Sequence, residues 1–168
     1  MPVDDGCTSA DHSLLAVKAP GPFERALVWA WSGNSADPLG DPVRGTTYAF
    51  CVYDTDDSDA GPHLVISAVV PPGPGWSAGA GKLMTYFDPS GVHGGIKAIA
   101  ITAPGIAPRG IVLEGGGEHL ALPPPGANLL AERPYVTAQL LNSAGGCWQA
   151  LYASPADASN SRLFSDHD

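Results

Sequence analysis

The stretch Thr46-Thr47-Tyr48-Ala49-Phe50-Cys51-Val52-Tyr53-Asp54 is the clearest strand in this sequence. β-Branched and aromatic residues favour the pleated backbone of a strand. Side chains along a strand point alternately to opposite faces, and here both alternating sets are apolar. That pattern predicts a central strand that is covered on both faces. The strand runs into an acidic loop, and because the next apolar run, Leu64 to Val70, follows at once, the two predict a hairpin.

Short apolar runs separated by glycine- and proline-rich turns continue along the whole chain. No segment keeps the 3.6-residue period of a helix over two turns, and the only helical candidate is one turn at Ala127 to Glu132. The runs that predict further strands are Ser13–Lys18, Arg25–Trp31, His63–Val70, Leu83–Phe87, Gly95–Thr102, Arg109–Glu114, His119–Leu122, Tyr135–Asn142 and Cys147–Ala153.

Many short strands at this spacing predict an all-β fold. We expect a single-domain antiparallel β-sandwich of jelly-roll or immunoglobulin-like type, with a small barrel as the alternative. The length of 168 residues suits one domain with a sizeable core. Residues 1–12 are predicted to be a polar N-terminal tail and residues 13–166 to form the sandwich.

The negative charge of the chain limits the classes of molecule that it is expected to bind. Eight Lys and Arg against 17 Asp and Glu give a formal net charge of −9, which would repel a phosphate backbone, so nucleic acid is not expected. No stretch approaches the roughly 18 apolar residues of a membrane helix, so no membrane span is expected. The start of the chain lacks the basic and apolar regions of a signal peptide.

The three cysteines bear on the compartment. Cys51 and Cys147 lie in predicted strands, and a disulfide between them would close about 100 residues and stabilise by roughly 4–5 kcal/mol. Such a bond favours an oxidising compartment. The alternative is two buried, reduced cysteines, since free Cys is among the most buried residue types. Cys7 is left over in the tail, either free or paired outside this chain.

Several motifs in a fixed order carry a resemblance. They are Leu27-Val28-Trp29-Ala30-Trp31, Gly40-Asp41-Pro42, Tyr48 to Asp54, Gly95-Ile96-Lys97, Val136 to Asn142, Cys147-Trp148-Gln149-Ala150 and Phe164-Ser165-Asp166. Together they resemble an uncharacterised secreted domain found in myxobacteria-like genomes, over residues 13–166. The resemblance implies export, and hence an extracellular or cell-surface location. It implies no biochemical activity.

The acidic loop is a candidate calcium site. Asp54, Asp56, Asp57 and Asp59 offer hard oxygen ligands within six residues, a density that calcium needs. The loop begins like an EF-hand, but it lacks the Gly at the sixth position and the Glu at the twelfth. The alternative is a solvated hairpin loop whose charge discourages association between sheet edges.

Aromatic side chains offer a second kind of site. Flat rings stack on sugar rings, while neighbouring polar groups hydrogen-bond the hydroxyls. Core packing accounts for Trp29, Trp31 and Trp148. Trp76, with Tyr86 and Asp88, lies in a Gly-rich region with little apolar company, so these three are predicted to form an exposed ligand-binding platform.

The sequence patterns that would indicate catalysis are weaker than those that indicate ligand binding. A copper or zinc site assembled from His63, His93 and His119 is one alternative, although no metal-binding spacing supports it. Two further catalytic alternatives are a serine near a histidine, Ser90 and His93, and a carboxylate pair for glycoside chemistry, Glu114 and Glu118. We therefore predict a non-catalytic extracellular module that binds polysaccharide or another cell-surface glycan. The alternatives are a structural or adhesive surface domain and a metal-dependent enzyme acting on polysaccharide.

Overall fold

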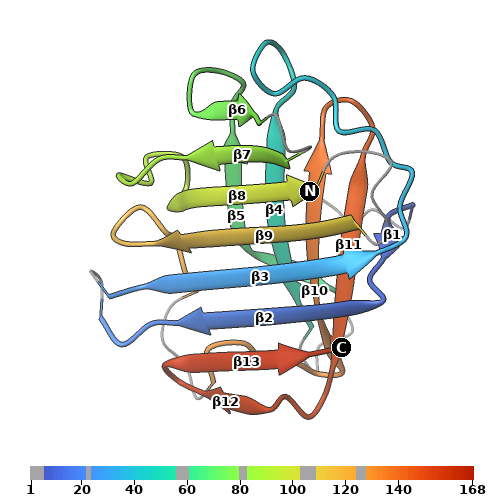
Figure 1. The fold of residues 1–168 in the computed structure, drawn as a ribbon. Helices are drawn as coiled ribbons and strands as arrows, with labels where there is room; N and C mark the ends of the chain where they lie inside the picture. Colours follow the sequence, from blue (N-terminus) through green and yellow to red (C-terminus); the bar gives the residue numbers. More distant parts are fainter. Residues whose placement is uncertain (1–5, 22–23, 56–60, 80–82, 103–108, 124–127) are drawn as a thin grey trace.

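Two β-sheets packed face to face form the protein. The computed structural model describes residues 6–21, 24–55, 61–79, 83–102, 109–123 and 128–168. Strands of the rear sheet cross those of the front sheet in Figure 1. The described residues contain no helix, and the two sheets do not close into a barrel. The all-β antiparallel sandwich predicted from the sequence is therefore confirmed, and the barrel alternative is not adopted.

The smaller sheet has five strands and contains the predicted central strand that ends at Asp54. Its strands, in spatial order, are β1 (Thr8–Ser9), β11 (Cys147–Ala153), β10 (Tyr135–Asn142), β4 (Tyr48–Asp54) and β5 (His63–Val70). The predicted β4–β5 hairpin is present, and β10 and β11 form a second hairpin. β4 lies between β10 and β5, which makes it an interior strand as predicted.

The larger sheet has eight strands. Their spatial order is β12 (Ala158–Asn160), β13 (Leu163–His167), β2 (His12–Lys18), β3 (Ala26–Gly33), β9 (Arg109–Gly116), β8 (Ile96–Thr102), β7 (Leu83–Phe87) and β6 (Trp76–Ala78). β8 and β9, both predicted as strands, pair with each other in antiparallel fashion. This order places two short hairpins, β6–β7 and β12–β13, at opposite edges of the sheet (Figure 1).

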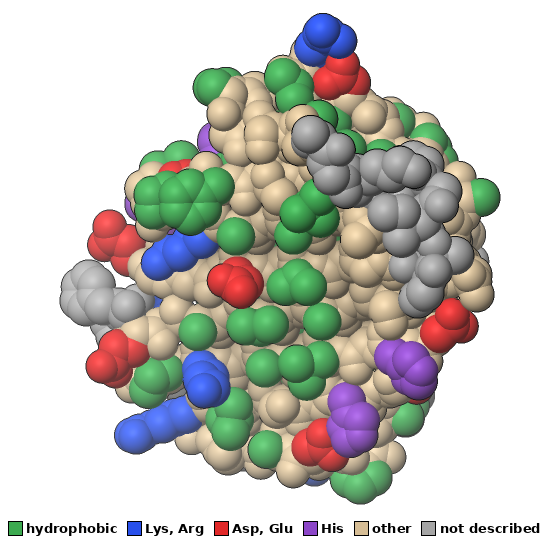
Figure 2. All heavy atoms as spheres, viewed as in Figure 1, with side chains coloured by type: hydrophobic (Ala, Val, Ile, Leu, Met, Phe, Trp, Pro, Cys, Tyr) green, Lys and Arg blue, Asp and Glu red, His purple; other side chains and the backbone are tan. Residues whose placement is uncertain are grey.

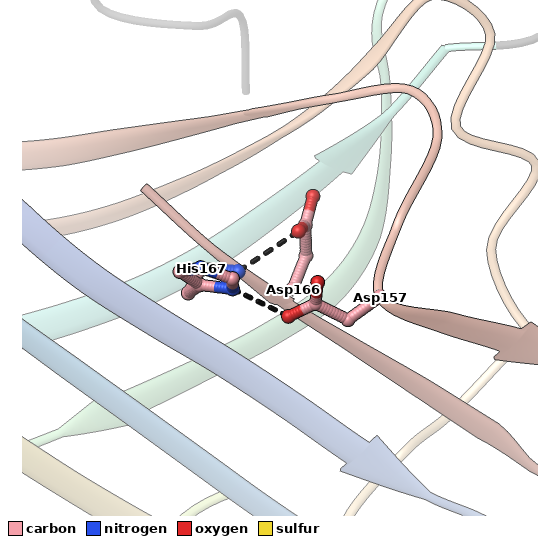
Figure 3. Close-up of side chains that lie close together, drawn as sticks. All are labelled: Asp157, Asp166 and His167. Atoms are coloured by element: carbon pink, nitrogen blue, oxygen red, sulfur yellow. Dashed lines mark hydrogen bonds and ion pairs between the residues drawn. The ribbon is translucent and has the colours of Figure 1, made fainter.

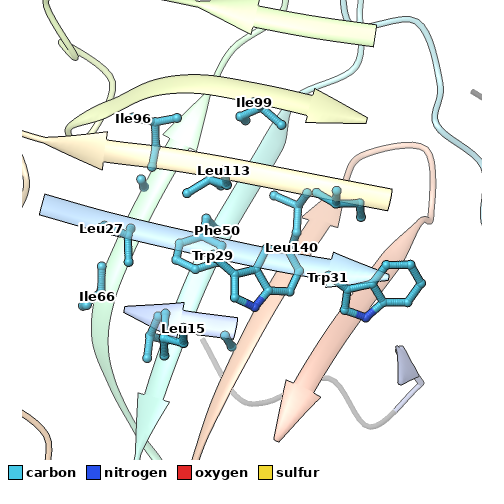
Figure 4. Close-up of a cluster of buried hydrophobic side chains, with 14 of the residues drawn as sticks. Leu15, Leu27, Trp29, Trp31, Phe50, Ile66, Ile96, Ile99, Leu113 and Leu140 are labelled. Carbon is cyan, nitrogen blue, oxygen red and sulfur yellow. The ribbon is translucent and has the colours of Figure 1, made fainter. Parts of the chain in front are cut away.

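The core fills the space between the sheets (Figure 4). Trp29, Trp31 and Trp148 are all fully buried, as the sequence predicted, and the Trp29 and Phe50 rings lie 5.4 Å apart. On β4, Cys51 points to the outer face, yet it is only 3 % exposed. The prediction that β4 is covered on both faces is therefore confirmed.

The ends of the chain and two short segments differ from the prediction. Residues 6–12 are no free tail, because β1 pairs with β11 and Cys7 is disulfide-bonded. Residues 119–122 form a loop and not a strand, although Leu120 is fully buried. Residues 128–132 are bends and loop where one helical turn was the candidate. A continuous apolar run does not fix secondary structure when it is this short.

The predicted Cys51–Cys147 disulfide is wrong. The bond joins Cys7 to Cys147, and Cys51 is free and buried. Cys51 pairs with Gln139 and Cys147 with Leu141, so β10 lies between the two cysteines. Two strand spacings separate them by nearly 10 Å, beyond the roughly 7 Å between Cα atoms that a disulfide spans. Burial also raises the pKa of the Cys51 thiol.

Candidate functional site

The predicted platform of Trp76, Tyr86 and Asp88 comes together at the β6–β7 edge, but its rings face inward. Trp76 is 3 % exposed and Tyr86 is 4 % exposed. The Trp76 ring lies 4.9 Å from that of Tyr48 and 5.2 Å from that of Tyr86, and its Nε1 donates to the carbonyl of Pro71. The prediction that Trp76 is exposed is wrong, because Tyr48, from a strand distant in sequence, packs on its ring together with Tyr86 from the neighbouring strand.

Asp88 organises the loop after β7. Its carboxylate accepts hydrogen bonds from the backbone N–H groups of Ser90 and Val92 and from the Ser90 hydroxyl. The bond from Ser90, chiefly, lowers the pKa of Asp88. The Tyr86 hydroxyl also lies 3.4 Å from it, and burial together with this carboxylate raises the pKa of Tyr86 to about 12. Asp88 therefore holds the loop, and its oxygens are already engaged.

A cavity opens beside this loop. It has a volume of about 300 Å³ and is lined by proline-rich residues 71–75 and by residues 86–89, 92 and 93. Phe87, next to the two predicted residues, is 68 % exposed and is the most exposed large apolar side chain described. A second cavity of about 390 Å³ is lined by residues 40–44 with Ser77, Ala78 and Met84. Both cavities border the β6–β7 edge, and the ring available for stacking there is Phe87.

The predicted calcium loop has a different role at its first residue. Asp54 is 4 % exposed. Its Oδ2 accepts a hydrogen bond of 2.6 Å from the backbone N–H of Ala131, and its Oδ1 accepts one of 2.8 Å from that of Glu132. It therefore anchors the chain before β10. Asp56, Asp57 and Asp59 lie outside the described residues.

A cluster that the sequence analysis missed lies at the opposite edge, around the β12–β13 hairpin. Ligand atoms of Asp157, Asp166 and His167 all lie within 4.8 Å of one another. Figure 3 shows dashed lines from His167 to both aspartates. The His167 ring contacts Asp157, and this bond raises the pKa of His167. Asp166 is 5 % exposed, and burial raises its pKa.

Glu132 adds a third carboxylate to this region. It is 4 % exposed, and its Oε1 has no hydrogen-bond partner. Its backbone has a φ of 54°, which only a few per cent of residues other than glycine adopt. Burial, and then the charges of Asp166 and Asp54, raise the pKa of Glu132. Asp54, Glu132 and Asp166 come from three distant segments, so the sequence alone did not show that these buried carboxylates act on one another.

The three histidines of the alternative copper or zinc site do not converge in the described residues. His63 begins β5, His93 borders the Phe87 cavity and His119 contacts Glu118 at 3.9 Å. Within the described chain, Asp157, Asp166 and His167 form the group whose ligand atoms converge. Ser90 bonds to Asp88 and is held there as part of the turn.

Comparison with known proteins gives no family for this chain. Among the described residues, no helix is long and apolar enough to cross a membrane. The sequence matches no protein-family model and no curated protein, and the fold matches no solved structure.

Proposed function

We propose that the protein is a non-catalytic extracellular binding module for carbohydrate, and that its ligand lies at the β6–β7 edge against Phe87. The observation that carries this proposal is the exposed Phe87 ring beside a cavity of about 300 Å³. A flat, exposed aromatic ring is suited to stacking on the apolar face of a sugar, and the cavity beside it gives the sugar a place to lie.

The ring is held by a rigid base. Phe87 continues β7 directly after Tyr86, whose ring packs on Trp76, and the backbone N–H of Phe87 donates to the carbonyl of Gly75. Asp88 fixes the loop that follows. A preorganised site loses less conformational entropy on binding, which favours the modest contacts that sugars make. The second cavity along the same edge gives room for an extended chain.

The extracellular location rests on the Cys7–Cys147 disulfide. It closes a separation of 140 residues, and such bonds persist in oxidising compartments. The resemblance to an exported domain favours the same location. The negative net charge of −9 agrees with a glycan and not a nucleic acid as the partner.

A structural or adhesive surface domain is the second candidate, and the outer face of the eight-stranded sheet favours it. Figure 2 shows hydrophobic side chains gathered over this face. The backbone register aligns Leu14, Ala30, Val112 and Ala100 in one row across four strands. Leu14 and Val112 are 38 % and 43 % exposed. Small side chains make such a face flat, which suits contact with another protein surface.

The test is binding of the purified protein to a panel of soluble and insoluble polysaccharides, with calcium present or chelated. Phe87→Ala removes the exposed ring. Leu151→Ala is the matched control, because Leu151 is 47 % exposed on the other sheet. Loss of binding in Phe87→Ala but not in Leu151→Ala would support the proposal.

Absence of binding across the panel would overturn the carbohydrate proposal. The adhesive candidate would then be tested by sedimentation at rising protein concentration. Val112→Asp places a charge in the apolar row, so it should abolish any self-association that the flat face produces, whereas Leu151→Asp should not.

A further inference from the structure

The β12–β13 edge carries a cluster of carboxylate and imidazole groups that is separate from the proposed carbohydrate site. Three potential ligands converge there within 4.8 Å: a carboxylate oxygen from Asp157, another from Asp166 and a ring nitrogen of His167. Asp157 precedes β12, and the other two end β13. The hairpin pairing of β12 with β13 brings them together.

The Asp166 carboxylate is turned toward its neighbour. Successive residues of a strand normally point to opposite faces. Here the carboxylate accepts the backbone N–H of His167 at 2.9 Å, so it stays near the position of that residue. The backbone N–H of Asp157 also donates to it. Asp166 is therefore oriented by two backbone groups, as metal-binding carboxylates commonly are.

A buried, unpaired carboxylate oxygen of Glu132 near this cluster is a second and independent indication of a ligand. Its carboxylate accepts the backbone N–H of Ala156, and the next N–H along the chain, from Asp157, serves Asp166. The two buried carboxylates therefore face the same turn. One Glu132 oxygen, Oε1, is buried without a hydrogen-bond partner. A buried oxygen of this kind is costly unless a cation or donor reaches it.

We propose that Asp157, Asp166 and His167 bind a divalent transition-metal ion of the zinc class, and that the Glu132 carboxylate, which lies outside the group of atoms within 4.8 Å, turns its unpaired oxygen toward the ion from the buried side. Imidazole nitrogen with carboxylate oxygen is a donor set that zinc accepts, whereas calcium takes six to eight oxygens. Two ligands of a tetrahedral zinc with bonds of about 2.0–2.1 Å lie roughly 3.3 Å apart. Atoms already within 4.8 Å need only small side-chain rotations to reach that spacing.

The ion would also offset the charge of this edge. Asp54, Glu132 and Asp166 are all buried, and their charges act on one another. The His167 ring lies on the exposed side of the cluster and leaves a path for the ion from solvent. Once bound, the ion would join the β12–β13 hairpin to the turn at residues 154–157 and strengthen the sheet at that edge.

The test is titration of the tag-free, chelator-treated protein with zinc chloride, followed by calorimetry, at a pH above the pKa of an ordinary histidine. We expect one ion per chain and a higher unfolding temperature with zinc, and no such effect with calcium. His167→Ala and Asp157→Asn should each weaken binding by about 10-fold or more. Both residues are exposed, so these variants should fold. Glu132→Gln should weaken binding less.

His119→Ala is the matched control. His119 is an exposed histidine beside a carboxylate, Glu118, but that pair has no converging third ligand among the described residues. Its removal should leave zinc affinity unchanged. The proposal is overturned if zinc does not bind, or if binding survives in both His167→Ala and Asp157→Asn. Unchanged affinity in Glu132→Gln would remove Glu132 from the site.

Discussion

Each edge of the eight-stranded sheet is formed by a short hairpin, but one edge gathers aromatic side chains and the other gathers ionisable ones. The β6–β7 edge buries aromatic rings and exposes one, Phe87. The β12–β13 edge buries the carboxylates of Glu132 and Asp166 and exposes a histidine, His167. The sequence predicted a site at the first edge, but it wrongly predicted that the rings of this site are exposed. It did not predict the cluster at the second edge. Composition shows which groups are present, whereas tertiary pairing decides which of them face water.

Trp76→Ala should have the largest effect on stability. Trp76 is 3 % exposed between the rings of Tyr48 and Tyr86, and removing a buried Trp typically costs about 3–5 kcal/mol. The free energy of unfolding would be measured by chemical denaturation with Phe87→Ala in parallel. If Trp76→Ala lowered the free energy of unfolding no more than Phe87→Ala, the Trp76 ring would be exposed in solution. That result would support the exposed platform of Trp76, Tyr86 and Asp88 predicted from the sequence.

Cys7→Ser should cost roughly 2–5 kcal/mol, because the disulfide closes a separation of 140 residues. The bond lies on the five-stranded sheet, away from both edges, so it should lower the stability of the whole domain without changing either site. Cys51→Ala is the control, since this thiol is free and buried. In the native protein, alkylation should label none of the three cysteines. Rapid labelling of Cys147 would contradict the observed pairing.

The two edges should respond to pH in opposite directions. Burial raises the pKa of Glu132 and of Asp166, and the bond to Asp157 raises that of His167. Each of these groups holds its proton more tightly in the folded state. Its contribution to stability is therefore complete below the unfolded pKa and is lost as pH rises through the folded pKa. At the other edge, Asp88 has a lowered pKa, so its contribution is lost as pH falls.

The measurement is the free energy of unfolding with chelator present, from about pH 4, where free carboxyl groups titrate, to about pH 8, above the value of a free histidine. Stability should fall as pH rises across this window, because the contributions of the three raised groups decline above the ordinary values of free carboxyl and imidazole groups, whereas the lowered pKa of Asp88 places its loss below the window. Glu132→Gln should flatten the decline, whereas the exposed Glu118→Gln should not. A decline of equal slope in Glu132→Gln would show that this carboxyl does not carry the effect.

Strand positions were predictable because alternation is a local property. β5, β7, β10 and β11 have the predicted bounds, and β4 begins two residues later than expected. β1, β6, β12 and β13 were not predicted. The first three have only two or three residues, which carry no period, and β13 lies in a segment whose apolar residues are Leu163 and Phe164. The disulfide needed knowledge of which strand lies between Cys51 and Cys147. The cluster at the β12–β13 edge needed the pairing of β12 with β13 and the packing of Glu132 against the turn at Ala156, which a linear pattern does not show.

Phe87→Ala should have the smallest effect on stability and the largest on ligand binding. Truncating a side chain that is 68 % exposed changes the free energy of unfolding by less than about 0.5 kcal/mol. If Phe87→Ala instead destabilised the protein by more than about 1 kcal/mol, the ring would be packing against the domain. The β6–β7 edge would then have no exposed aromatic group among the described residues, and the flat outer face of the eight-stranded sheet would become the stronger candidate for contact with a partner.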